Sequence, residues 1–152
     1  MIVAQSLTDG SAGDAGEGIK LLQSVGRKIR SFTADGAYDS SAIYKSAKAR
    51  GAKVVVPPSR KAAAPTKRKS QLPERDRAIR RISKLGRRRW KSESGYHRQG
   101  RVENSFFRFK SIVGGRLRTR QADAQATEAL IACNVLNRVL ELGWPRSVAI
   151  PR

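Results

Sequence analysis

The chain has 152 residues, which suits one domain, and 39% of them are hydrophobic, which is sufficient for a core. Its 32 Lys and Arg side chains against 12 Asp and Glu side chains give a formal net charge of +20, which favours a polyanionic partner such as nucleic acid over an anionic membrane surface. Because no apolar run approaches the roughly 18 residues of a spanning helix and no signal peptide is recognisable, we expect a soluble, cytoplasmic protein.

The first 56 residues predict alternating strands and helices. The segment "IVAQSLT" (2–8) has the composition of a strand, and "DAGEGIKLLQSV" (14–25) carries the apolar stripe of a helix. A strand over 29–34, a helix that ends at Gly51 and a strand over 54–56 follow. This order of strand, helix and strand favours parallel pairing in an α/β sheet.

Asp35 comes directly after the second predicted strand, in the sequence "DGAYD". In parallel sheets, functional groups gather just beyond the carboxyl ends of the strands. An Asp followed by Gly is also typical of a tight turn, in which the carboxylate organises the backbone. Taken by itself, Asp35 is therefore either a turn residue or a candidate functional carboxylate.

The positive charge is concentrated between Pro57 and Lys91, where fourteen basic and two acidic residues give a net charge of +12. The first part, "PPSRKAAAPTKRKSQLP", predicts an extended or disordered linker, and the second part predicts a short basic helix. Trp90 either packs this segment against the body or stacks on a base, and packing is favoured. The segment is either a solvated arm or a phosphate-binding surface, and its charge favours the latter. Its candidate DNA-binding residues are Lys67, Arg68, Lys69, Arg87, Arg88 and Arg89.

From Arg101 onward the sequence has helical periodicity. Glu103 and Lys110 lie seven residues apart on one face of this helix. Glu103 is either an intrahelical partner of basic side chains or a metal ligand that converges with Asp35 on a hard divalent cation. An apolar stripe at the edge of this face is expected to dock on the sheet, and its members are Val102, Phe106, Phe109 and Val113.

Residues 125–144 predict a last helix that is apolar on more than one face. We expect it to close the core, with a dimer contact as the alternative. Cys133, the single cysteine, lies in this helix in the sequence "ALIACNVL". That setting predicts a small buried core residue rather than a catalytic thiol, and an internal disulfide is impossible.

Three segments together resemble the second half of a DDE transposase of bacterial insertion sequences, groups four and five. They are "FTADGAYDS", "GYHRQGRVENSFFRFK" and "ALIACNVLNRVL", and the resemblance extends over residues 2–139. Around its last acidic residue this family carries the signature Y-(2)-R-(3)-E-(6)-K. Tyr96, Glu103 and Lys110 fit it at the correct spacing, while Gln99 occupies the position of the arginine.

The resemblance implies an RNase H-like fold in which three acidic residues hold two Mg²⁺ or Mn²⁺ ions. By position, Asp35 matches the second acid and Glu103 the third, so both are candidate catalytic and metal-binding residues. The first acid belongs on a strand upstream of residue 2, and we interpret Asp9 and Asp14 as helix-capping residues. The chain is accordingly expected to be one N-terminally truncated RNase H-like domain over 1–152 that contains the basic linker and helix and ends in helices. Five further residues are expected to contact DNA near the cut end: Tyr96, His97, Arg98, Arg101 and Lys110.

The implied function is DNA binding with metal-dependent strand cleavage and transfer in insertion-sequence transposition. We expect the chain to act on element ends and target DNA, as a homo-oligomer or with an upstream transposase fragment, in the nucleoid and not at a membrane. Without its first acid the chain is expected to be inactive alone. The alternatives are an inactive remnant and a non-enzymatic nucleic-acid-binding protein.

Overall fold

The computed structural model describes residues 1–9, 11–63 and 73–143. These residues form two compact units, which are described separately below. One unit comprises Thr8–Glu103, and the other comprises Met1–Leu7 with Asn104–Arg152. The expectation of one domain over the whole chain stays a prediction.

The unit of residues 8–103 contains two short parallel strands, β1 (Ser31–Thr33) and β2 (Lys53–Val55). Their register pairs Phe32 with Val54. β1 is shorter than the predicted strand over 29–34, β2 begins one residue before the predicted strand over 54–56, and the parallel pairing is confirmed. The described part of the chain is thus a mixed α/β structure that is mostly helical, with a two-stranded sheet.

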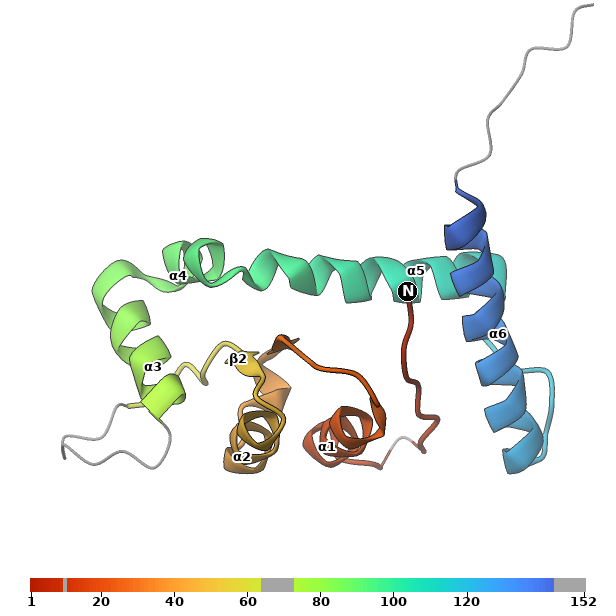
Figure 1. The fold of residues 1–152 in the computed structure, drawn as a ribbon, viewed down its shortest axis with the longest axis horizontal. Helices are drawn as coiled ribbons and strands as arrows, with labels where there is room; N and C mark the ends of the chain where they lie inside the picture. The colour runs from red at the N-terminus through yellow and green to blue at the C-terminus, as the bar shows by residue number, and fades with distance from the viewer. Residues whose placement is uncertain (10, 64–72, 144–152) are drawn as a thin grey trace, which may run out of the picture. The chain divides into compact units, whose positions relative to one another are not determined.

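Two helices, α1 (Asp14–Ser24) and α2 (Ser41–Ala49), pack against each other beside the strands (Figure 1). The buried core that they share consists of Leu22, Ile43, Ala47 and Ala52. Ser40 caps α2, because its hydroxyl accepts a hydrogen bond from Ile43 N–H at 3.4 Å. Both helices agree with the periodicity of the sequence.

A glycine in α1 makes room for the turn after β1. A Cβ atom on Gly18 would lie 2.8 Å from the ring of Tyr38, the last residue of the short 3₁₀ helix η1 (Gly36–Tyr38). Phe32 contacts the same ring edge-on, with the ring centroids 5.8 Å apart. The Tyr38 ring is therefore held between α1 and β1, and this fixes the turn that Asp35 begins.

The basic segment contains two helices, α3 (Pro73–Leu85) and α4 (Arg87–Ser94), which pack against each other. The 3₁₀ helix η2 (Tyr96–Gln99) follows, after Gly95 at φ +79° has ended α4. Ile79 and Trp90 are buried, with Trp90 only 6% exposed, so the predicted packing role of Trp90 is confirmed. The predicted linker falls partly on residues 64–72, which lie outside the described residues.

The other unit contains α6 (Ala122–Leu142) and most of α5 (Gly100–Ile112). The predicted last helix is confirmed, and Ala129, Ala132, Cys133 and Leu136 are its buried residues. Cys133 is a free, buried thiol, as its sequence setting predicts. Among the described residues, no helix has both the length and the apolar character needed to cross a membrane.

The predicted strand over 2–8 is wrong, because the structure has no regular secondary structure there. The described sheet has two strands, and neither pairs with this segment. Asn137 of α6 satisfies the backbone instead: its Oδ1 accepts from Ile2 N–H at 2.6 Å, and its Nδ2 donates to Ile2 O at 2.7 Å. The amide of one side chain thus pairs with both backbone groups of Ile2.

The predicted burial of the apolar stripe on α5 is also wrong for its first half. Val102 is 44% exposed and Phe106 is 64% exposed, and α5 has no buried residue. Phe109 and Val113 are half-buried. Periodicity identified the helix correctly, but it says only which side chains share a face and not whether that face is covered.

Candidate active site

Asp35 follows β1 and caps η1, so the turn that the sequence predicts is present. Its Oδ1 accepts a hydrogen bond from Ala37 N–H at 2.9 Å. The residue is exposed, and within the described ranges no hydrogen bond reaches its Oδ2. The turn role therefore uses one carboxylate oxygen and leaves the other accessible to a ligand.

Tyr96 lies close enough to Asp35 and Glu103 to respond to both charges. The pKa of its phenol is raised, first by partial burial and then by the negative charges of Asp35 and Glu103. Two contacts orient the ring: Trp90 lies beside it with centroids 6.3 Å apart, and Lys91 Nζ lies 4.8 Å from its centroid. The phenol is thus a fixed, protonated group with two carboxylates in its electrostatic neighbourhood.

The local fold explains this neighbourhood. η2 packs against β1, so Tyr96 is carried to the strand that precedes Asp35. Glu103 is exposed in the first turn of α5, which begins directly after η2. The 3₁₀ helix η2, which lies between Gly95 and Gly100, therefore places Tyr96 beside β1 and leads directly into the helix that carries Glu103.

A second tyrosine responds to the charge of Asp35. Burial raises the pKa of the Tyr38 phenol, and the charges of Asp14 and Asp35 raise it further. Asp14 is the first residue of α1, where a negative charge is favourable to the helix dipole, but the N-cap is Gly13 and no side chain caps the helix, so the predicted capping role of Asp9 and Asp14 is wrong. Asp9 has a local role too, because its Oδ1 accepts hydrogen bonds from Ser11 N–H and Oγ.

A bidentate ion pair that the sequence analysis did not identify fixes the loop after η1. Arg75 of α3 donates from Nε and Nη2 to the two carboxylate oxygens of Asp39, both at 2.8 Å. The Asp39 side chain is 4% exposed, and it also accepts from Ser59 N–H at 3.1 Å. We call this pair the Asp39–Arg75 latch. It joins the loop that contains Asp35 to the basic segment.

The predicted basic contacts fall into three groups. Lys67, Arg68 and Lys69 lie outside the described residues. Arg87 donates to Pro58 O at 2.7 Å, and Arg89 pairs with Glu93 at 3.2 Å, so both have structural partners. The remaining predicted contacts are exposed in the described structure, and they are Arg88, His97, Arg98, Arg101 and Lys110.

The donor set fits a divalent cation in part. Asp35 and Glu103 offer the hard, exposed carboxylate oxygens that Mg²⁺ and Mn²⁺ prefer. Within the described ranges, however, no group of three or more His, Cys, Asp or Glu side chains could hold a metal ion. Mg²⁺ is commonly bound through one or two carboxylates together with substrate phosphates, so two carboxylates are compatible with an ion that arrives with DNA.

The comparison with protein families agrees with this chemistry. The model of the transposase DDE domain matches residues 1–138, which is most of the chain. The chain therefore belongs to the transposase DDE domain family. No solved structure matches it. Membership supports a general role in transposition and DNA recombination with DNA as the partner, in a family that generally depends on divalent metal ions.

Proposed function

We propose that this chain supplies the second and third acidic residues, Asp35 and Glu103, of an RNase H-like transposase domain from an insertion sequence of groups four and five. The observation that carries the proposal is the packing of η2, which directly precedes the helix of Glu103, against β1, which Asp35 follows. The two acids are 68 positions apart in the chain: Asp35 stands at the predicted strand end, and Glu103 belongs to the family signature. The reaction is cleavage of DNA at the element ends and transfer of the strand to a target.

The two carboxylates would hold Mg²⁺ or Mn²⁺ together with phosphate oxygens of the DNA. When bound, the metal supplies activation of the attacking hydroxyl group and stabilises the charge on the attacked phosphate. Because Asp35 Oδ1 is engaged by Ala37 N–H, the carboxylate is oriented before a ligand arrives. This preorganisation lowers the entropic cost of binding at the exposed Oδ2.

Tyr96 has a separate role in this proposal. Its phenol is protonated at neutral pH, as in any tyrosine with an ordinary or raised pKa, so it can donate a hydrogen bond to a phosphate oxygen. Four exposed residues of the same unit would hold the DNA backbone around it, while Lys110, the last residue of the signature, belongs to the other unit. The four residues are Arg88, His97, Arg98 and Arg101.

We further propose that the 152 residues alone bind DNA without cutting it. The described residues provide Asp35 and Glu103 as candidate ligands and no group of three metal-binding side chains. A pair of metal ions needs a bridging ligand and more donors than two carboxylates provide. A third acid from another segment, or from a partner fragment, would complete the site.

The test is Mg²⁺-dependent nicking and strand transfer on DNA that carries the terminal repeats of the encoding element. The assay compares the chain alone with the chain extended by the residues encoded directly upstream. We expect binding by both and strand transfer by the extended form alone, reduced to background by Asp35→Ala or Glu103→Ala because each removes a metal ligand. Asp123→Ala, at an exposed carboxylate in the first turn of α6, is the matched control.

Two results would contradict the proposal. Strand transfer that survives Asp35→Ala and Glu103→Ala in the extended form would remove both residues from the catalytic site. Binding without strand transfer in either form would favour the inactive remnant or the non-enzymatic DNA-binding protein. Equal affinity for terminal repeats and unrelated DNA would then separate the non-enzymatic protein from a remnant that still recognises element ends.

A further inference from the structure

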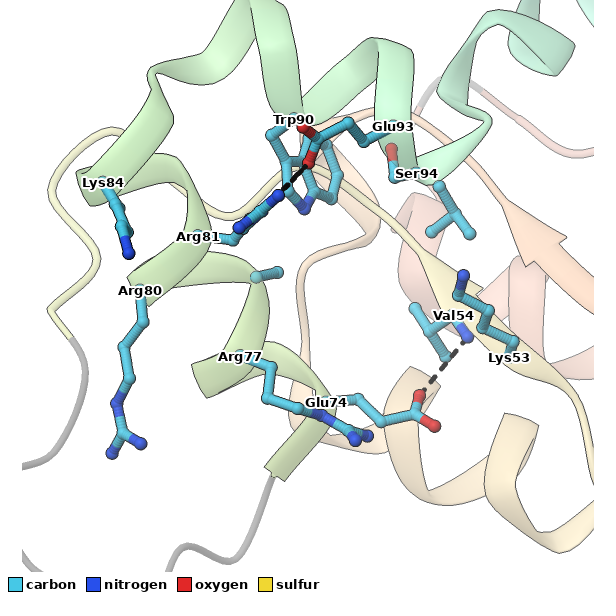
Figure 2. Close-up of a pocket in the computed structure, with 12 residues that line it drawn as sticks. Lys53, Val54, Glu74, Arg77, Arg80, Arg81, Lys84, Trp90, Glu93 and Ser94 are labelled. Carbon is cyan, nitrogen blue, oxygen red and sulfur yellow. Dashed lines mark hydrogen bonds and ion pairs between the residues drawn. The ribbon is translucent and has the colours of Figure 1, made fainter.

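An open cleft of about 660 Å³ lies between β2, α3 and α4, and neither Asp35 nor Glu103 lines it. Its walls carry two carboxylates, Glu74 and Glu93, and five basic side chains. Figure 2 shows Arg77 and Arg81 projecting from α3 and Lys53 on the strand side. The five basic residues of the cleft are Lys53, Arg77, Arg80, Arg81 and Lys84.

Both carboxylates of the cleft already have partners. Glu93 accepts from Arg81 at 2.8 Å and from Arg89 at 3.2 Å, and these two contacts hold its pKa below the ordinary value. Glu74 Oε2 accepts from Val54 N–H at 3.4 Å. In contrast, Lys53, Arg77 and Lys84 form no ion pair with a carboxylate in the described structure. The cleft therefore carries positive charge that the chain itself does not neutralise.

The floor of the cleft is apolar and closed to bases. Val54, Val55, Ala78 and Trp90 contribute to the lining. Trp90 is 6% exposed, and its ring lies against Tyr96, so its face is not free to stack on a nucleobase. An apolar floor beneath a cationic rim suits an alternation of sugars and phosphates more than it suits an extruded base.

We propose that this cleft binds the sugar–phosphate backbone of a DNA strand, with phosphates at Lys53, Arg77 and Lys84 and deoxyribose against the apolar floor. The inference rests on the proposed function in one respect, which is that the polyanion bound by the cleft is DNA. Contacts of this kind position DNA without reading its sequence. They would extend the DNA-binding surface to three basic residues that the family signature does not contain.

The experiment measures the affinity for a labelled DNA duplex of random sequence by fluorescence anisotropy over a range of salt concentrations, with EDTA present. The test variant combines Lys53→Ala, Arg77→Ala and Lys84→Ala. Each phosphate contact contributes about 0.9 to the slope of log affinity against log salt concentration on duplex DNA, so the slope should fall by about 2.7. The charge-preserving variant Lys53→Arg, Arg77→Lys and Lys84→Arg should keep most of the slope.

The control variant removes the same charge from exposed positions that do not line the cleft: Lys28→Ala, Lys45→Ala and Lys48→Ala. An equal loss of slope in test and control variants, or no loss in the test variant, would overturn the inference. A wild-type preference for RNA over DNA of the same sequence that disappears in the test variant would overturn the assignment to DNA. Circular dichroism and thermal melting confirm that each variant is folded.

This result can be distinguished from failure of the proposed function. The salt slope is measured in EDTA, without the metal that the catalytic proposal requires, and strand transfer is measured separately with Mg²⁺. If the slope falls in the cleft variant while strand transfer is never observed, the cleft stands and the catalytic proposal fails. If strand transfer depends on Asp35 while the slope is unchanged in the cleft variant, the catalytic proposal stands and the cleft inference fails.

Discussion

At the scale of single residues, Tyr96 is the side chain whose pKa is affected by both proposed metal ligands, Asp35 and Glu103. Its phenol responds to the charges of Asp35 and Glu103, while Lys91 and Trp90 hold its ring. Ionisation of the phenol would add a third negative charge beside two carboxylates. Partial burial, and then these two charges, raise the pKa of the phenol above the ordinary tyrosine value of about 10, so it stays protonated to a higher pH.

We predict that Asp35→Asn and Glu103→Gln each lower the pKa of Tyr96 toward its ordinary value, because each removes a charge that opposes ionisation. Mg²⁺ bound between the carboxylates should lower the pKa further in the wild-type chain. The measurement is a pH titration of ¹³C-tyrosine by NMR. Tyr96→Phe assigns the signal, since Tyr38 and Tyr44 also have raised pKa values.

Asp123→Asn, far along the sequence in α6, is the control for a general change in charge. If neither Asp35→Asn nor Glu103→Gln alters the titration of Tyr96, the two carboxylates do not share its surroundings. The proposed metal site would then lose one of its supports.

Some single-residue roles were predictable, and others were not. The burial of Cys133 and the packing of Trp90 follow from local sequence, and the structure confirms both. The latch was missed because Asp39 and Arg75 are 36 positions apart, and no local pattern links an Asp at the end of a turn to one Arg among many. Asp35 follows β1 and begins a turn, as predicted. The turn engages only Oδ1, through Ala37 N–H, so the turn interpretation and the ligand interpretation are compatible.

At the scale of secondary structure elements, periodicity succeeded where the partner of an element lies nearby in the chain. The strand, helix and strand from β1 to β2 form one local parallel unit, and α1 packs on it. The segment 2–8 has strand composition but no strand partner in the described sheet, and Asn137 takes over its backbone at Ile2. Composition alone does not reveal whether a partner is present.

The Asp39–Arg75 latch is the contact between elements that we expect to matter most for the loop of Asp35. Arg75→Ala would leave the Asp39 carboxylate buried without its cation, so we predict a loss of about 3 kcal/mol in the free energy of unfolding. Asp39→Ala should cost a similar amount. The double variant should cost less than the sum by about 1 to 2 kcal/mol, because the two residues act as a pair.

Urea denaturation of the four proteins measures this coupling. Lys45→Ala, on the exposed face of α2, is the control and should change the free energy of unfolding by less than about 0.5 kcal/mol. Additive effects of Asp39→Ala and Arg75→Ala would show that the ion pair does not join the two elements.

At the scale of the whole molecule, the net charge of +20 predicted the class of partner, and family membership supports DNA. The charge did not predict which basic residues are available. Arg87 and Arg89 are engaged by Pro58 O and Glu93, whereas Lys53, Arg77 and Lys84 are unpaired within the described structure. Tertiary contacts decide which basic side chains are engaged within the fold and which are available to bind DNA.

The central claim is that Asp35 and Glu103 hold one divalent ion together when DNA is bound. The most direct measurement is Mn²⁺ retained by the DNA complex, followed by electron paramagnetic resonance, in the wild-type chain, Asp35→Asn, Glu103→Gln and the double variant. Because a shared ion needs both ligands, we predict that each single variant loses Mn²⁺ to the same extent as the double variant. Independent, additive losses, or retention of Mn²⁺ in either single variant, would contradict a common site.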